Sequence, residues 1–133
     1  MSDVVYLSLK DLLVVVRRTL GVVELRDAGG LESAAARPQT TVFGADAYGS
    51  LDEKAAALCH SIVRNHPLVD GNKRLGLAAL IAFYGLNGLE LSFSNDEAYD
   101  LIMAIATGEL DDVSTISGQL AGHTRPRRRQ DEG

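Results

Sequence analysis

The stretch SLDEKAAALCHSIVRNHPLVDGNKRLGLAALIAFYGLN, residues 50–87, decides the fold, because it contains two apolar helical segments joined by a short polar turn. Ser50 and Glu53 form a capping-box pattern that starts the first segment. Pro67 stops it, since the residue before a proline disfavours the α conformation. The second segment is apolar nearly all round, which is typical of a helix at the centre of a bundle. The stretch therefore predicts two core helices, over 51–65 and 72–87.

Other helix signals surround this pair. Apolar residues at helical spacing predict a helix over 9–20, with Ser8 and Asp11 forming a capping box at its start. Thr40–Phe43 has β-type composition but is too short for an independent sheet, so we expect a flap or small hairpin there. Further helices are predicted over 31–36, between Ser94 and Gly108, and from Asp111 or Asp112 to Leu120. The predicted fold is an all-α, compact bundle.

The length and composition suit a single globular domain. The chain has 133 residues, of which 46% are hydrophobic, so it can bury its own core. No apolar run is long enough to span a bilayer, and Met1-Ser2-Asp3 lacks the basic start of a signal peptide, so we expect no membrane contact. A single cysteine, Cys59, excludes an internal disulfide and is compatible with a reducing compartment. A cytoplasmic location is the expectation.

Charge separates the body of the chain from its end. The net charge of −5 argues against a general nucleic-acid binder. Residues 1–122 are predicted to form the domain, and 123–133 a polar, disordered tail that contains the basic run Arg125–Arg129. That run is either a contact for nucleic acid or a partner, or a solvated terminus. We favour the solvated terminus, and expect no direct nucleic-acid binding by this chain.

Nine residues between the core helices carry most of the candidate chemistry: His66-Pro67-Leu68-Val69-Asp70-Gly71-Asn72-Lys73-Arg74, here called the 66–74 segment. A histidine titrates near neutral pH and can take a proton from a hydroxyl. The Asp70 carboxylate is a hard oxygen ligand suited to Mg²⁺. Gly71 leaves room for a ligand close to the backbone.

The end of the 66–74 segment opens the second core helix. The first N–H groups of a helix, together with the Lys73 ammonium, can hold phosphate oxygens, and Asn72 stands at the same place. Arg74 adds a guanidinium for phosphate or for a structural carboxylate. Base, metal ligand and anion cradle are the parts that phosphoryl transfer requires. The same residues are also compatible with an ordinary turn, a helix cap and surface charges.

The 66–74 segment resembles the signature of the Fic/Doc family. That signature reads approximately His-x-Phe-x-(Asp/Asn/Glu)-(Gly/Ala)-Asn, followed by Gly-x-Arg in the Fic branch or Lys-Arg in the Doc branch. The matching residues are His66, Asp70, Gly71, Asn72, Lys73 and Arg74. Ala106–Glu109 and, loosely, most of residues 6–122 are also similar to the Doc branch. Leu68 departs from the phenylalanine that anchors the family loop in the core, and Pro67 is more typical of the Fic branch.

The resemblance implies a Fic/Doc-type helical bundle with a short β-like flap. It also implies a toxin–antitoxin module, in which the Doc-type toxin is a protein kinase that uses ATP and Mg²⁺. Doc proteins share Lys73 where Fic enzymes have a second glycine, and they move the γ-phosphate of ATP rather than AMP. The implied target is a threonine of elongation factor Tu, so that translation is arrested. The implied restraining partner is a small Phd-type antitoxin.

The resemblance assigns roles residue by residue. His66, Asp70 and Lys73 are expected to be catalytic, with His66 as the base and Asp70 as the metal ligand. The phosphates are expected to be held at Gly71, Asn72, Lys73 and Arg74. Arg64 either reaches the same pocket or is a surface arginine, and Thr40–Phe43 is expected to dock the target as an edge strand. Two alternatives remain open: a Fic-type AMP transferase (AMPylator), and a binding module without activity.

Overall fold

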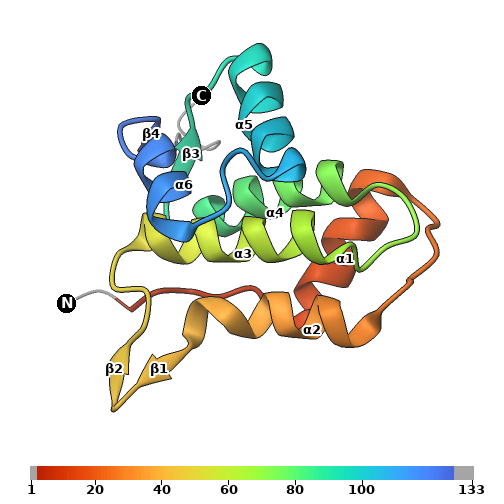
Figure 1. The fold of residues 1–133 in the computed structure, drawn as a ribbon, viewed down its shortest axis with the longest axis horizontal. Helices are drawn as coiled ribbons and strands as arrows, with labels where there is room; N and C mark the ends of the chain where they lie inside the picture. Colours follow the sequence, from red (N-terminus) through yellow and green to blue (C-terminus); the bar gives the residue numbers. More distant parts are fainter. Residues whose placement is uncertain (1–2, 128–133) are drawn as a thin grey trace.

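The computed structural model describes residues 3–127. Within this range six α-helices and four short strands form one layered bundle (Figure 1). In chain order the elements are α1 (Leu9–Leu20), α2 (Ala28–Ala36), a 3-10 turn η1 (Arg37–Gln39), β1 (Thr41–Val42), β2 (Ala45–Asp46), α3 (Leu51–Asn65), α4 (Asn72–Leu86), β3 (Leu89–Leu91), α5 (Asn95–Thr107), α6 (Val113–Leu120) and β4 (Thr124–Pro126). The all-α prediction is confirmed. The predicted flap forms a small hairpin of β1 and β2, and a second two-stranded sheet, β3 with β4, joins segments far apart in the sequence.

Side-chain caps set the helix starts, as the sequence predicts. All three capping boxes form: Ser8 with Asp11, Ser50 with Glu53, and Ser94 with Glu97. Asp112 caps α6. Helix α2 begins at Ala28 rather than at Leu31, because the Asp27 carboxylate accepts a hydrogen bond from the Gly30 N–H at 2.9 Å and so includes two glycines in the first turn.

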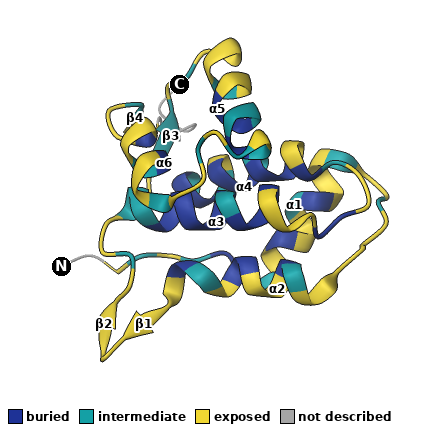
Figure 2. Ribbon diagram, viewed as in Figure 1, coloured by how far each residue is buried: buried dark blue, intermediate teal, exposed yellow. Residues whose placement is uncertain are grey.

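The core lies between α3 and α4, which are the most deeply buried helices (Figure 2). Their backbones approach closely at Gly76, where an added Cβ would lie only 2.5 Å from Val63 Cγ2. Cys59 is fully buried at the same contact. Because any larger side chain at Gly76 would push the helices apart, this glycine fixes the distance between the two helices that carry the 66–74 segment.

The predicted flap is a two-stranded hairpin, β1 with β2, and its tip residue Phe43 is fully exposed. The flap is tied to the core by Lys54 of α3, whose side chain is 2% exposed. Its ammonium lies 3.1 Å from Asp46 Oδ2 and 2.6 Å from the Tyr48 carbonyl oxygen. Burial opposes the charge, yet the bond to Asp46 leaves the pKa of Lys54 raised.

The structure differs from the predicted disordered tail over its first residues. Strand β4 pairs antiparallel with β3, and Arg125 Nε lies 3.3 Å from Glu90 Oε1. Arg127 donates to the Gly85 carbonyl at the end of α4, at 3.1 Å. The ordered chain therefore continues past residue 122. Residues 128–133, with the rest of the basic run, lie outside the described residues.

None of the helices in the described part of the chain has the length and apolar character needed to cross a membrane.

Candidate active site

The 66–74 segment joins the C-terminus of α3 to the N-terminus of α4. His66 caps α3 with left-handed backbone angles, φ 51° and ψ 59°, and Gly71 caps α4 with φ 95°. Leu68 is fully buried between these caps, so leucine anchors the loop in the core as the family's phenylalanine is expected to do. The imidazole of His66 and the carboxylate of Asp70 belong to exposed residues on either side of this anchor.

Asn72 holds the loop closed from inside. Its Oδ1 accepts from the Leu68 N–H and its Nδ2 donates to the Leu68 carbonyl, both at 2.9 Å. Because these two bonds fix the orientation of the amide, Nδ2 faces His66 Nδ1 at 3.4 Å. That distance is long for a hydrogen bond, so the contact orients the imidazole more than it selects which ring nitrogen carries the proton. The Asn72 side chain is 8% exposed and serves the loop itself.

Gly71 is required at its position for two independent reasons. Its φ of 95° is a conformation that side chains with a Cβ rarely adopt. A Cβ would also lie 2.9 Å from Leu20 Cδ1 at the end of α1. The turn between Asp70 and α4 therefore packs directly on α1.

The first turn of α4 has the features of the predicted anion site, here called the cradle. Its first intrahelical bond runs from the Leu75 N–H to the Gly71 carbonyl, so the N–H groups of residues 72–74 have no partner within the helix. The helix dipole and the exposed Lys73 ammonium add positive potential there. Asp70 Oδ1 accepts from the Gly71 N–H at 2.9 Å, which places a carboxylate beside the cradle.

The two other candidate arginines bind elsewhere in the described structure. Arg74 donates to the Thr19 carbonyl at the end of α1, at 3.1 Å. Arg64 donates to the Ala106 carbonyl at 3.0 Å, and its Nε lies 3.4 Å from Asp111 Oδ1. Both guanidinium groups therefore tie helices together, and phosphate binding by them stays a prediction.

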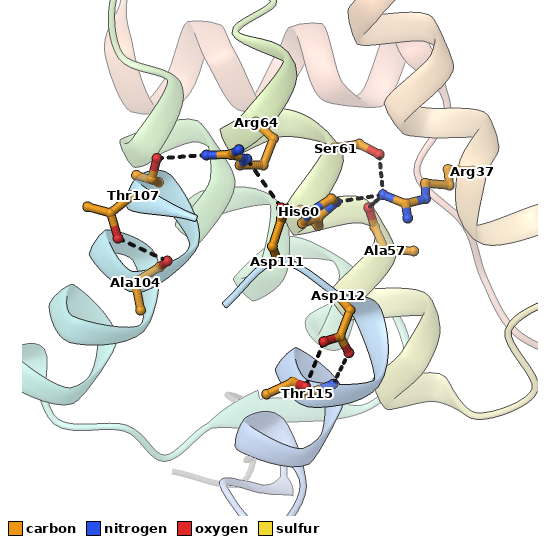
Figure 3. A network of polar contacts seen from close by, with 11 residues as sticks. Arg37, Ala57, His60, Ser61, Arg64, Ala104, Thr107, Asp111, Asp112 and Thr115 are labelled. Carbon is orange, nitrogen blue, oxygen red and sulfur yellow. Dashed lines mark hydrogen bonds and ion pairs between the residues drawn. The ribbon is translucent and has the colours of Figure 1, made fainter. Parts of the chain in front are cut away.

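A polar network connects the α5–α6 loop to α3 and to η1 (Figure 3). Arg37 lies 2.9 Å from His60 Nδ1, and His60 Nε2 lies 3.0 Å from Asp111 Oδ1. The bond to His60, followed by the charge of Arg64, holds the pKa of Asp111 below its usual range. The network braces the last turns of α3, from which His66 projects.

An apolar recess of about 360 Å³ adjoins the cradle between α4 and α5. A larger recess of about 700 Å³ lies between α1, the C-terminal half of α4 and β3, and none of the predicted site residues lines it. Of these two recesses, only the smaller one is lined by predicted site residues. Its lining residues are Lys73, Arg74, Leu77, Asn95, Ala98, Tyr99, Ile102 and Met103.

A model of the family described as the Fic/DOC family matches residues 6–84, which include the flap, α3, most of α4 and the 66–74 segment. The chain belongs to the Fic/DOC family. It is 49% identical over 104 residues to Toxin Doc of Mycolicibacterium smegmatis, covering 77% of this chain and 79% of that protein. It is 31% identical over 100 residues to Protein kinase doc of Escherichia phage P1, covering 75% and 77% respectively.

The donor set of this Fic/DOC chain fits a Mg²⁺ ion that arrives with a nucleotide. Among residues 3–127 no group of three or more His, Cys, Asp or Glu side chains is arranged to hold a metal ion alone. Mg²⁺ is commonly bound by one or two carboxylates together with substrate phosphates and water. Asp70, exposed beside the cradle, is suited to supply that carboxylate.

Sequence reasoning missed the residues that support the Fic/DOC loop from the α1–α2 connection. Residues 24–27 pair with the backbone of the 66–74 segment. This connection has no helical periodicity and no repeated strand pattern. Its only local signal is the helix cap at Asp27, which says nothing about a partner far along the chain.

Proposed function

We propose that this chain is the toxin of a toxin–antitoxin pair and a protein kinase of the Doc type. It transfers the γ-phosphate of ATP to a hydroxyl, most simply a threonine, of a translation factor such as elongation factor Tu, in the cytoplasm. A Phd-type antitoxin restrains it. The similarity to one protein named as a toxin and another named as a protein kinase supports this proposal.

The main support for the proposal is the position of His66 beside the N-terminus of α4. The Asn72 side chain is the physical link, because it reaches Leu68 and His66 Nδ1 from the first residue of α4. This link supports the proposal that His66 acts as a base beside an anion site at the start of α4. Phosphoryl transfer depends mainly on such positioning and on charge stabilisation.

The proposed reaction balances as follows. The target hydroxyl oxygen forms a bond to the γ-phosphorus of ATP, and the bond from that phosphorus to the β–γ bridging oxygen breaks, which releases ADP. The hydroxyl proton passes to the imidazole of His66. Lys73 and the free N–H groups of α4 stabilise the phosphate oxygens. A Mg²⁺ held by Asp70 would supply further charge neutralisation.

Lys73 favours γ-phosphate transfer over AMP transfer. In the Fic branch a glycine at this position leaves space for nucleotide phosphates, whereas a lysine fills that space and adds a point charge. A point charge suits the outermost phosphate, which carries the most negative charge.

The recess between α4 and α5 supports a nucleotide as the phosphate donor. Its volume, about 360 Å³, lies at the lower end of the range for small-molecule sites. Lys73 lines it and also opens the cradle, so a nucleoside in the recess would have its phosphates at the helix N-terminus. Tyr99, which is 64% exposed, offers an aromatic ring for a base.

Induced expression in a bacterium tests the biological part of the proposal. We expect growth arrest with the natural chain, loss of arrest with His66→Ala, and loss with Lys73→Ala. His123→Ala is the matched control, because it removes a histidine at the α6–β4 connection, and it should arrest growth normally. Arrest that persists in His66→Ala would contradict a catalytic toxin and favour a binding module.

A second arm tests the antitoxin. Co-expression of the reading frame next to the gene should restore growth and give a complex that co-purifies with the chain. A neighbouring product that neither binds the chain nor restores growth would contradict that pairing.

A further inference from the structure

Residues 24–27, between α1 and α2, run alongside the 66–74 segment across a sequence separation of about 40 residues. Leu25 forms an antiparallel bridge with the buried Leu68. The backbone bonds that flank this bridge are Arg26 N–H to Pro67 O at 2.8 Å, Asp27 N–H to Pro67 O at 3.0 Å and Val69 N–H to Glu24 O at 3.0 Å. The α1–α2 connection therefore supports the loop throughout its first half.

The Arg26 side chain extends this support to the end of α3. Its Nε donates to the His66 carbonyl at 2.8 Å, and a terminal guanidinium nitrogen donates to the Asn65 carbonyl at 2.9 Å. Carbonyl groups at a helix C-terminus carry partial negative charge and lack partners within the helix. A planar guanidinium is suited to bind two such oxygens at once.

His66 needs an external partner because of the residue that follows it. Its φ of 51° lies in the left-handed region, which is unfavourable for a residue with a Cβ. A helix that ends in this conformation is commonly closed by the N–H of the next residue, bonded back to a helix carbonyl. Here the next residue is Pro67, which has no N–H. The Arg26 guanidinium supplies donors to this helix end that the proline cannot.

We infer that Arg26 is a positioning residue for His66: it holds the left-handed backbone from which the imidazole is presented to the α4 cradle. This inference rests on the proposed function for the role of His66 as the base. The backbone part does not depend on activity, because the bonds from Arg26 are to the carbonyl groups of Asn65 and His66.

The test compares three variants of the full chain: Arg26→Ala, Arg26→Lys and, as matched control, Arg17→Ala on the exposed side of α1. Lysine keeps the charge but cannot span two carbonyls. The first readout is the intraresidue Hα–HN NOE of His66 in the isotope-labelled protein, which is strong when φ is positive. The second is kcat and KM for ATP in γ-phosphate transfer.

In Arg26→Ala we expect a weakened NOE at His66 and a fall in kcat of about 10- to 100-fold, as displacement of a catalytic group by about 1 Å produces. KM for ATP should change less than about twofold, since the cradle is on α4. The His66 NOE and the kcat of Arg26→Lys should fall between those of Arg26→Ala and the natural chain. Both values for Arg17→Ala should match those of the natural chain.

An unchanged His66 NOE together with unchanged kcat in Arg26→Ala would overturn the inference. An equal loss of kcat in Arg17→Ala would overturn the inference as well, because the loss would then not be specific to Arg26. If Arg26→Ala does not fold, Arg26→Gln is judged by the same criteria. If the natural chain transfers no label, the proposed function fails, while the NOE still decides whether Arg26 holds the backbone.

Discussion

The side-chain amide of Asn72 binds both backbone polar groups of Leu68, accepting from its N–H and donating to its carbonyl at 2.9 Å each. Leu68 is fully buried, so water cannot replace these bonds. The residue predicted to hold phosphate is thus first of all a structural clamp, and its backbone N–H is the group left for the predicted anion site.

Asn72→Ala should therefore lower stability as well as activity. It leaves two buried backbone groups without partners, which costs about 1–3 kcal/mol for each unsatisfied group. Asn72→Asp keeps the acceptor but loses the donor, and should have an intermediate effect. Urea unfolding gives the free energy of unfolding of both variants. The control is Asn65→Ala, which replaces an exposed asparagine at the end of α3. Equal stability of Asn72→Ala and the natural chain would contradict the clamp.

Glycine substitutions separate backbone strain from steric contact. In Gly71→Ala the new Cβ stands on a residue with a φ of 95° and lies 2.9 Å from Leu20 Cδ1. In Gly88→Ala the φ is also positive, but the space around the new Cβ is open. Gly118→Ala has neither a positive φ nor a close contact, and should stabilise α6 by about 0.5–1 kcal/mol. Thermal unfolding should rank the variants Gly118→Ala, Gly88→Ala, Gly71→Ala in order of falling stability. A Gly71→Ala protein as stable as Gly88→Ala would show that Leu20 does not constrain the turn.

The predictions from sequence succeed where a local signal decides the structure. The boxes at Ser8, Ser50 and Ser94 satisfy helix N–H groups within one turn, so their effect is readable without knowledge of the fold. The turn between α3 and α4 is also readable locally, because Pro67 and Gly71 act within a few residues of the two helix ends.

The failures concern pairing across long separations. Residues 124–126 are polar and follow a short helix, so nothing local distinguishes strand β4 from a frayed end; its partner β3 lies about 35 residues earlier. Arg26 is likewise an exposed arginine in an irregular connection until its distant partners are known. A test of the basic run by truncation must therefore begin after Arg127, since an earlier cut removes β4 or the bonds from Arg127 to Gly85 and Gly88.

The Asp111 network predicts a pH dependence of stability. The pKa of this carboxyl is lowered in the folded chain, so the folded state is favoured while Asp111 is ionised. The contribution is complete at neutral pH and is lost as the pH falls through the lowered folded value, below about pH 4. Asp111→Asn should be slightly less stable than the natural chain at pH 7 and equal to it in strong acid. Asp100→Asn is the charge-matched control; a pH-independent difference for Asp111→Asn would contradict the ionic contribution.

Cys59 reports on the integrity of the α3–α4 contact. Burial raises the pKa of its thiol to about 12 and removes it from solvent. An alkylating reagent should therefore leave the native chain unmodified at pH 8 and label it fully in concentrated urea. Rapid labelling without denaturant would mean that α3 and α4 separate in the native state.

The most direct test of the account is label transfer from ATP carrying the label on either the γ- or the α-phosphate, with purified chain, Mg²⁺ and purified elongation factor Tu. We expect the γ label alone to enter the factor, with loss of transfer in His66→Ala and normal transfer in His123→Ala. Entry of the α label instead would make the chain an AMP transferase, and would contradict the assignment of Lys73 to the γ-phosphate.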